Sequence, residues 1–224
     1  ALEDTIFIFP EGILTSVYLE DLKSYEKLFK NNFSSNHKII LGINSNKDSK
    51  IFNSLAVLDN NLNTLFQYNK NKLVPFGEVL PFENLFSKLG MKKITTGYQS
   101  FISDDNRKIF SINNIKFLPL ICYEIIYTGR LNKNNNDFDF IINISEDGWF
   151  GNSIGLEQHF SHSIFRAIEE GKNLIRSANN GTTAFIDPMG QVIEAIESTH
   201  KGVIEVNSFK KVEKTFFSKN GNII

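Results

Sequence analysis

The run Ile115–Glu124, IKFLPLICYE, leads an apolar segment directly into the only cysteine of the chain. A short, mostly apolar run of this kind is typical of a buried strand. A nucleophile at the carboxyl end of such a strand lies where the backbone turns sharply and its side chain is exposed at the sheet edge. A lone cysteine is more often a small buried hydrophobic residue. Interpreting Cys122 as a nucleophile therefore depends on the residues that accompany it.

Two charged residues also stand at the ends of predicted strands. Glu11 follows the apolar run Ile6–Phe9, where a carboxylate must be solvated or paired. Beside a thiol it can act as a general base. Lys70 ends a predicted hairpin, Leu55–Leu58 with Thr64–Tyr68, and an ammonium there can stabilise an oxyanion and favour a thiolate. Each charge alone is an ordinary solvated strand end, but Glu, Lys and Cys together form a less common combination.

Strand and helix patterns alternate along the rest of the chain. Apolar periodicity predicts helices over Ser16–Phe33 and Glu157–Gly171, with Gly171 as a stop signal. This alternation indicates an α/β architecture, while the hairpins indicate mixed rather than purely parallel sheets. We expect one domain, residues 1–224, with two sheets face to face and helices outside. The other predicted strands are Lys38–Ile43, Phe138–Ile144, Leu174–Ala178, Thr183–Ile186 and Val203–Val206.

The composition excludes several classes of protein. Hydrophobic residues make up 41% and charged residues 22%, which is ordinary for a soluble globular domain. The 24 basic and 25 acidic side chains leave a net charge of -1, so we expect no nucleic-acid partner. One cysteine permits neither an intramolecular disulfide nor a thiolate metal cluster. No stretch approaches the roughly 18–20 apolar residues that a membrane helix needs.

Four strings narrow the interpretation. They are Tyr68–Glu78 (YNKNKLVPFGE), Ile121–Glu124 (ICYE), Asp147–Ser153 (DGWFGNS, followed shortly by QHF) and Arg176–Gly181 (RSANNG). Together with the order Glu, Lys, Cys, they resemble the apolipoprotein N-acyltransferase family of the nitrilase, or carbon-nitrogen hydrolase, superfamily. The resemblance covers nearly the whole chain, and the LVPFGE string is highly specific.

This resemblance implies both a fold and a site. The fold would be a four-layer α-β-β-α sandwich with two mixed sheets. Glu11, Lys70 and Cys122 would be the catalytic triad, and the supporting residues would be Asn53, Glu78, Tyr123 and Glu124. Asn53 matches less securely because the following loop is shorter here. Two positions depart from the family pattern: Glu146 stands where Asn is usual, and Leu156 where Pro is usual. Both positions lie outside the triad, so these departures bear on the structure of the loops and not on the expected activity.

The resemblance also implies a reaction. Cys122 would take an acyl group from a phospholipid as a thioester and pass it to the α-amine of a diacylglyceryl-modified apolipoprotein, without a cofactor or metal. The domain would face the periplasm at the bacterial inner membrane. We expect the chain to begin after the first strand of such a domain, to lack the membrane helices and to be soluble by itself.

The segment Leu73–Phe101 is unusually apolar for a loop and is punctuated by prolines and a glycine. Long apolar loops often act as lids or binding arms. We predict a membrane-facing lid, with Phe82 and Phe86 among the inserted side chains. Packing of this loop on the core is the alternative.

Other chemistries fit parts of the chain. A Gly-x-Ser-x-Gly string places Ser153 before Asp187 and His200, in the order of a serine esterase, but no strand feeds it. Cys122 with His159 or His162 could form a thiol protease dyad, and the two histidines could bind a metal. None of these alternatives explains Glu11 or Lys70.

Two further alternatives concern the whole function. A soluble nitrilase-family amidase would use the same triad with water as the acceptor, but would not need so apolar a segment after Leu73. A non-catalytic binding module would leave the order Glu, Lys, Cys unexplained.

Overall fold

Two β-sheets form the centre of the molecule. The computed structural model describes residues 3–79, 100–129, 131 and 137–222. The first sheet has the order β1-β2-β3-β4, from Thr5–Ile8, His37–Lys47, Lys50–Leu58 and Thr64–Asn69. The second has the order β10-β9-β8-β7-β6-β5, from Val192–Ile196, Thr183–Ile186, Asn173–Asn179, Phe140–Glu146, Ile115–Ile121 and Phe110–Ile112.

Both sheets are mixed, as the sequence predicts. In the first, β1 runs parallel to β2, and the other neighbours are antiparallel. In the second, β6, β7 and β8 are parallel, while β5, β9 and β10 join antiparallel. The parallel strands β6 and β7 bring their carboxyl ends to one edge, where Cys122 lies.

The two sheets pack face to face through alternating side chains. Successive residues of a strand point to opposite faces. Ile40 of β2 and Ile121 of β6 therefore join one core between the sheets. Their neighbours Leu41 and Leu120 point outward into separate apolar clusters. Strands β6 and β7 are buried on both faces, so their residues are mostly apolar.

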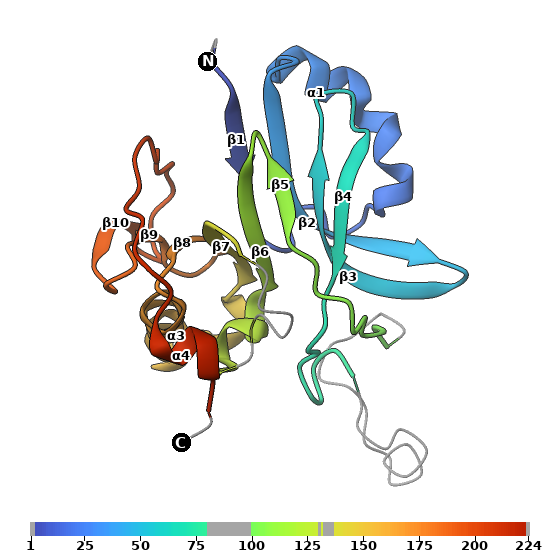
Figure 1. Ribbon diagram of the computed structural model, residues 1–224. Helices are drawn as coiled ribbons and strands as arrows, with labels where there is room; N and C mark the ends of the chain where they lie inside the picture. Colours follow the sequence, from blue (N-terminus) through green and yellow to red (C-terminus); the bar gives the residue numbers. More distant parts are fainter. Residues whose placement is uncertain (1–2, 80–99, 130, 132–136, 223–224) are drawn as a thin grey trace, which may run out of the picture.

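Helices cover the outer faces (Figure 1). The 3-10 helix η1, Leu19–Tyr25, and α1, Glu26–Asn32, pack on the first sheet, and α3, Gly155–Glu170, packs on the second. The predicted four-layer α-β-β-α sandwich is confirmed. The short helices η2, Cys122–Ile126, η3, Gly148–Phe150, and α4, Phe216–Asn220, complete the described elements. Among the described residues, no helix is long and apolar enough to cross a membrane.

Some element boundaries differ from the predictions. The single helix expected over Ser16–Phe33 is wrong: Tyr18 is still extended and bridges to Asn44, and a 3-10 helix precedes α1. No strand forms at Val203–Val206, although Ile204 and Val206 pack against the central core. Alternating apolar residues thus identify side chains that pack inward, but they do not supply a hydrogen-bonded neighbour.

Two predictions about local turns are confirmed. The hairpin between β3 and β4 turns at Asp59, whose carboxylate accepts hydrogen bonds from the backbone nitrogens of Asn61 and Asn63. Helix α3 ends at Gly171, which adopts the left-handed conformation with φ of 60°. A glycine is favoured there because it has no Cβ to clash.

Candidate active site

Cys122 lies at the junction between β6 and η2 in an uncommon backbone conformation. Its φ is 47°, in the left-handed region that side chains other than glycine rarely adopt. Such a residue costs on the order of 1–3 kcal/mol and persists only where its surroundings hold it. The side chain is 7% exposed, so the thiol lies just below the surface at the end of the strand.

Glu124 holds the turn that contains Cys122. This carboxylate is fully buried, and its Oε2 accepts a hydrogen bond of 2.8 Å from the backbone nitrogen of Ile121. Its Oε1 accepts from the Tyr68 hydroxyl at 2.6 Å and forms an ion pair of 2.8 Å with Arg107. The backbone nitrogens of Asn71 and Lys72 also donate to Oε1. Glu124 thereby ties the cysteine turn to the chain that follows β4.

Lys70 directly follows β4 and meets two carboxylates. Its ammonium lies 2.9 Å from Oε1 of Glu78 and 3.6 Å from Oε1 of Glu11, and its side chain is 1% exposed. The Asn53 amide donates to both carboxylates, at 2.6 Å to Glu11 and 2.8 Å to Glu78. A buried ammonium next to two oxygens that accept further hydrogen bonds is held in one geometry.

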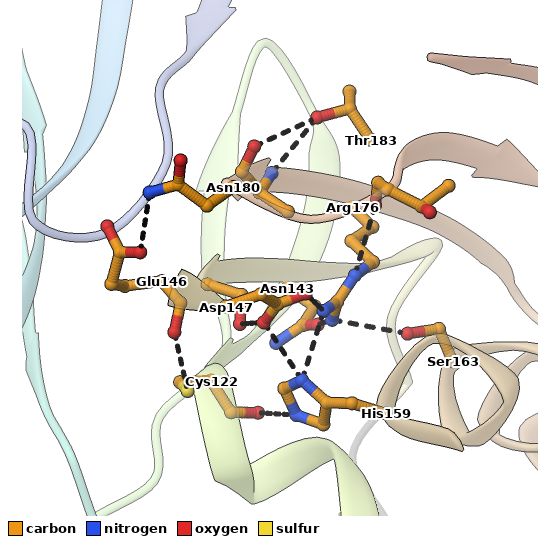
Figure 2. A network of polar contacts seen from close by, with 12 residues as sticks. Cys122, Asn143, Glu146, Asp147, His159, Ser163, Arg176, Asn180 and Thr183 are labelled. Atoms are coloured by element: carbon orange, nitrogen blue, oxygen red, sulfur yellow. Dashed lines mark hydrogen bonds and ion pairs between the residues drawn. The ribbon is translucent and has the colours of Figure 1, made fainter. Parts of the chain in front are cut away.

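The backbone of Glu146 connects this charged cluster to the thiol. Its nitrogen donates to Oε2 of Glu11 at 2.9 Å, and its carbonyl oxygen lies 3.8 Å from Sγ of Cys122. The Glu146 carboxylate accepts from the Asn179 amide, the Asn180 amide and the Gly148 nitrogen, and the contact with Asn180 is drawn in Figure 2. The Glu at this position thus takes its side-chain partners from the segment after β7, from the end of β8 and from the turn that follows β8.

Burial and charge set the proton affinities of the three groups. Burial raises the pKa of Glu11, against the lowering effect of the Lys70 charge. Burial alone would lower the pKa of Lys70, but the charges of Glu11 and Glu78 outweigh it and raise that pKa. Burial, with the Glu11 charge, raises the pKa of Cys122 to about 12. The Cys122 thiol is therefore protonated at neutral pH, and the Glu11 carboxyl group binds a proton more readily than an exposed carboxyl group does.

The remaining predicted residues are Tyr123, in η2, and Leu156, in α3. Tyr123 follows Cys122, and its ring packs edge-on against Tyr127 at 5.7 Å. Leu156 is the second residue of α3, and its backbone nitrogen donates to the carbonyl oxygen of Ser153 at 3.3 Å. Of the predicted lid, residues 80–99, which include Phe82 and Phe86, lie outside the described residues.

The serine esterase alternative finds no support in the contacts of its residues. The Ser153 hydroxyl accepts from the Gly155 nitrogen. Asp187 pairs with Lys210, and His200 lies 3.1 Å from the Thr199 hydroxyl. None of the hydrogen bonds within the described part of the chain joins Ser153, Asp187 and His200 to one another.

A buried network beside Cys122 was not predicted from the sequence. Asp147, which follows β7, forms an ion pair of 2.6 Å with Arg176 of β8 and lies 2.9 Å from Nδ1 of His159. Nε2 of His159 faces the carbonyl oxygen of Cys122 rather than its sulfur (Figure 2). The strings DGWFGNS, QHF and RSANNG contain these residues, but the sequence does not show that they meet.

Among the described residues, Cys122 and two members of this network, Asp147 and His159, are spaced closely enough to resemble a metal site. One ligand atom each from Cys122, Asp147 and His159 lies within 4.8 Å of the others. Both Asp147 oxygens already have partners, because Oδ1 faces Ser145 and His159 while Oδ2 faces Arg176. A cation bound there would also lie close to the Arg176 guanidinium. The arrangement therefore favours a hydrogen-bond network over a metal site.

Fold and sequence together define the class of this protein. The sequence profile of the carbon-nitrogen hydrolase family matches residues 6–208, and the chain belongs to that family. Among curated proteins, the apolipoprotein N-acyltransferase of Rickettsia prowazekii is 36% identical over 99% of this chain and 45% of its own length. That of Rickettsia bellii is 40% identical over 81% of this chain and 37% of its own length. The chain thus spans less than half the length of these relatives.

Solved structures show the same fold. An amidase from Nesterenkonia sp. AN1 superposes with a TM-score of 0.60, covering 86% of this chain and 75% of its own. Its sequence is only 13% identical to this chain, so the likeness concerns the fold alone.

Proposed function

We propose that this chain is the catalytic domain of an apolipoprotein N-acyltransferase, with Glu11, Lys70 and Cys122 as its catalytic residues. The observation that carries the proposal is the 36% identity over 99% of the chain to a protein of that name. The chemistry is supported by the buried Glu11–Lys70 ion pair next to the Cys122 turn.

In the first half-reaction, Sγ of Cys122 attacks the ester carbonyl carbon of a phospholipid. Glu11 takes the thiol proton, and Lys70 stabilises the oxyanion that forms. When the carbon–oxygen bond breaks, Glu11 returns the proton to the leaving oxygen, which yields a lysophospholipid and a thioester on Cys122. Asn53 and Glu78 hold Glu11 and Lys70 in place, and Glu124 holds the turn.

In the second half-reaction, the α-amine of a diacylglyceryl-modified lipoprotein attacks the thioester. Glu11 accepts a proton from the amine, the carbon–sulfur bond breaks, and the proton passes to sulfur. The product is an amide, and the thiol is restored. We place this reaction at the periplasmic face of a bacterial inner membrane, with residues 1–224 as one domain.

The test uses the full-length protein with native phospholipid and a matched pair of alanine variants. Peptide mass spectrometry should find an acyl thioester on Cys122 in the wild type and in Ser153→Ala, but none in Cys122→Ala. Addition of a diacylglyceryl peptide should then release the acyl group as an amide. Release as free fatty acid regardless of the peptide, together with hydrolysis of small amides, would favour the amidase. An adduct lost in Ser153→Ala would favour the serine esterase.

A further inference from the structure

A charged network lies beside Cys122 and takes no part in the steps above. Asp147, His159 and Arg176 are each at most 3% exposed, and they come from three separate parts of the second sheet and its covering helix. Figure 2 shows the His159 ring between the Asp147 carboxylate and the backbone of Cys122. Burying polar and charged side chains costs free energy of folding unless they are paired, as these three are.

The hydrogen bonds fix how the imidazole is oriented. Nε2 of His159 lies 3.3 Å from the carbonyl oxygen of Cys122. A carbonyl oxygen only accepts, so Nε2 carries a hydrogen and donates it. On the other side of the ring, Nδ1 lies 2.9 Å from Oδ1 of Asp147, to which it can donate. The ring is therefore held at both nitrogens.

Asp147 and Arg176 are themselves held by surrounding groups. Oδ1 of Asp147 accepts from the Ser145 hydroxyl at 2.6 Å, and its Oδ2 faces Arg176 at 2.6 Å. Burial would raise the pKa of Asp147, but the hydrogen bond from His159 and the charge of Arg176 outweigh it and lower that pKa to about 2. Arg176 also donates to Asn143 of β7 and to the carbonyl of Thr182. The carboxylate is thus an ionised, fixed anchor for the ring.

His159 contacts the backbone of Cys122, the residue with the uncommon left-handed conformation. Cys122 is in the left-handed region, and the direction of its carbonyl follows from that conformation. Glu124 restrains the chain before Cys122 through the Ile121 nitrogen, and His159 restrains the carbonyl after it. Relaxing the carbonyl would rotate the Cα and redirect Sγ.

We propose that His159 is a positioning residue: it holds the Cys122 carbonyl, and thereby aims Sγ toward Glu11 and Lys70, while Asp147 and Arg176 orient its ring. This inference rests on the proposed role of Cys122 as nucleophile. It predicts that the reactivity of Cys122 depends on a hydrogen-bond donor at the position of Nε2, which contacts the Cys122 carbonyl oxygen. A donor at the position of Nδ1 should not replace it.

Two substitutions at His159 distinguish a donor at the Nε2 position from a donor at the Nδ1 position. In His159→Gln the amide nitrogen reaches the region of Nε2, whereas in His159→Asn it reaches only the region of Nδ1. In the full-length protein, His159→Asn should slow acyl-thioester formation on Cys122 by about ten- to a hundredfold, with KM for phospholipid unchanged. His159→Gln should retain most of the rate. The melting temperatures of the two variants should agree.

A second readout needs no lipid. Iodoacetamide alkylation of Cys122, followed by peptide mass spectrometry, should also be slower in His159→Asn than in His159→Gln. If the wild type forms no acyl thioester but this order of alkylation holds, the proposed function fails and the positioning role stands. Equal rates in both variants would overturn the positioning role, as would losses that simply follow their melting temperatures.

Discussion

At the residue scale, the Glu11 carboxyl is the group whose environment most directly sets the proposed chemistry. It is buried next to Lys70, Glu78 and Asn53, and its second oxygen accepts from the Glu146 nitrogen. Burial and the Glu78 charge raise its pKa, and Lys70 keeps the carboxylate paired. The pKa of the Cys122 thiol is about 12, so a raised pKa of Glu11 reduces the pKa difference between the proton donor and the proton acceptor. A smaller difference favours proton transfer from the thiol to Glu11.

This argument predicts the acid limb of the pH profile. Only the carboxylate form of Glu11 can accept the thiol proton, so the rate should fall as the pH drops through its raised pKa. The fall should begin at a higher pH than a carboxyl at the ordinary value of 4.5 would give. Measured by acyl-thioester formation, Glu11→Gln should remove this limb and lower the rate by about 10²–10⁴-fold. A wild-type profile that stays flat down to the ordinary value would contradict the role of Glu11.

At the scale of elements, strand β2 presses directly on the backbone that carries Glu11. A Cβ added at Gly42 would lie 2.6 Å from Cα of Glu11 and 3.1 Å from a methyl of Ile144. Contacts under 3 Å to backbone force something to move. The absence of a side chain at Gly42 therefore allows the chain segment after β1 to pass close enough to bring Glu11 toward Lys70.

We accordingly expect Gly42→Ala to impair catalysis by displacing Glu11. Acyl-thioester formation should drop by about tenfold or more, because small misplacements of a reacting group are costly. Gly151→Ala is the matched control, since Gly151 has a φ of 53° but no atom within 4 Å of the added Cβ. With φ of 53° and ψ of -144°, Gly151 is in a region that side chains rarely adopt, so the variant should lose about 1–3 kcal/mol of stability from backbone strain and keep the rate per folded molecule unchanged. Equal activity losses in the two variants would argue against the close approach at Gly42.

At the scale of the whole molecule, the two sheets are joined by polar contacts as well as by the apolar core. Tyr68 of the first sheet donates to Glu124, which follows β6 of the second. Arg107 pairs with the same carboxylate at 2.8 Å and also donates to the Tyr68 oxygen. The junction is buried, so its charges depend on one another.

Removing one partner of this junction should therefore reduce the free energy of unfolding. Arg107→Met leaves the buried Glu124 carboxylate without its cation and should reduce the free energy of unfolding by about 3–5 kcal/mol. Lys30→Met is the control, because Lys30 pairs with Glu26 on an exposed helical surface. That pair should contribute little to stability, because solvent screens exposed ion pairs. Denaturant unfolding measures both variants, and equal losses would mean that the junction is not a stabilising contact.

The sequence by itself determined the class of fold and the candidate triad. Apolar runs that end in Glu11, Lys70 and Cys122 mark strand ends, because local periodicity and turn residues report on secondary structure directly. It could not place β5 or β10, which are a three-residue strand and an edge strand with mostly exposed side chains. Such strands exist through pairing with neighbours, and pairing leaves little local pattern.

Only the tertiary structure decided what surrounds the thiol. The left-handed backbone of Cys122 and its contact with His159 depend on residues far apart in the chain. Asp147 and Arg176 are likewise paired through the register of β7 and β8. A sequence motif records which side chains are present, whereas burial and hydrogen-bond geometry determine their protonation and direction. Those properties arise only when the second sheet and α3 pack together.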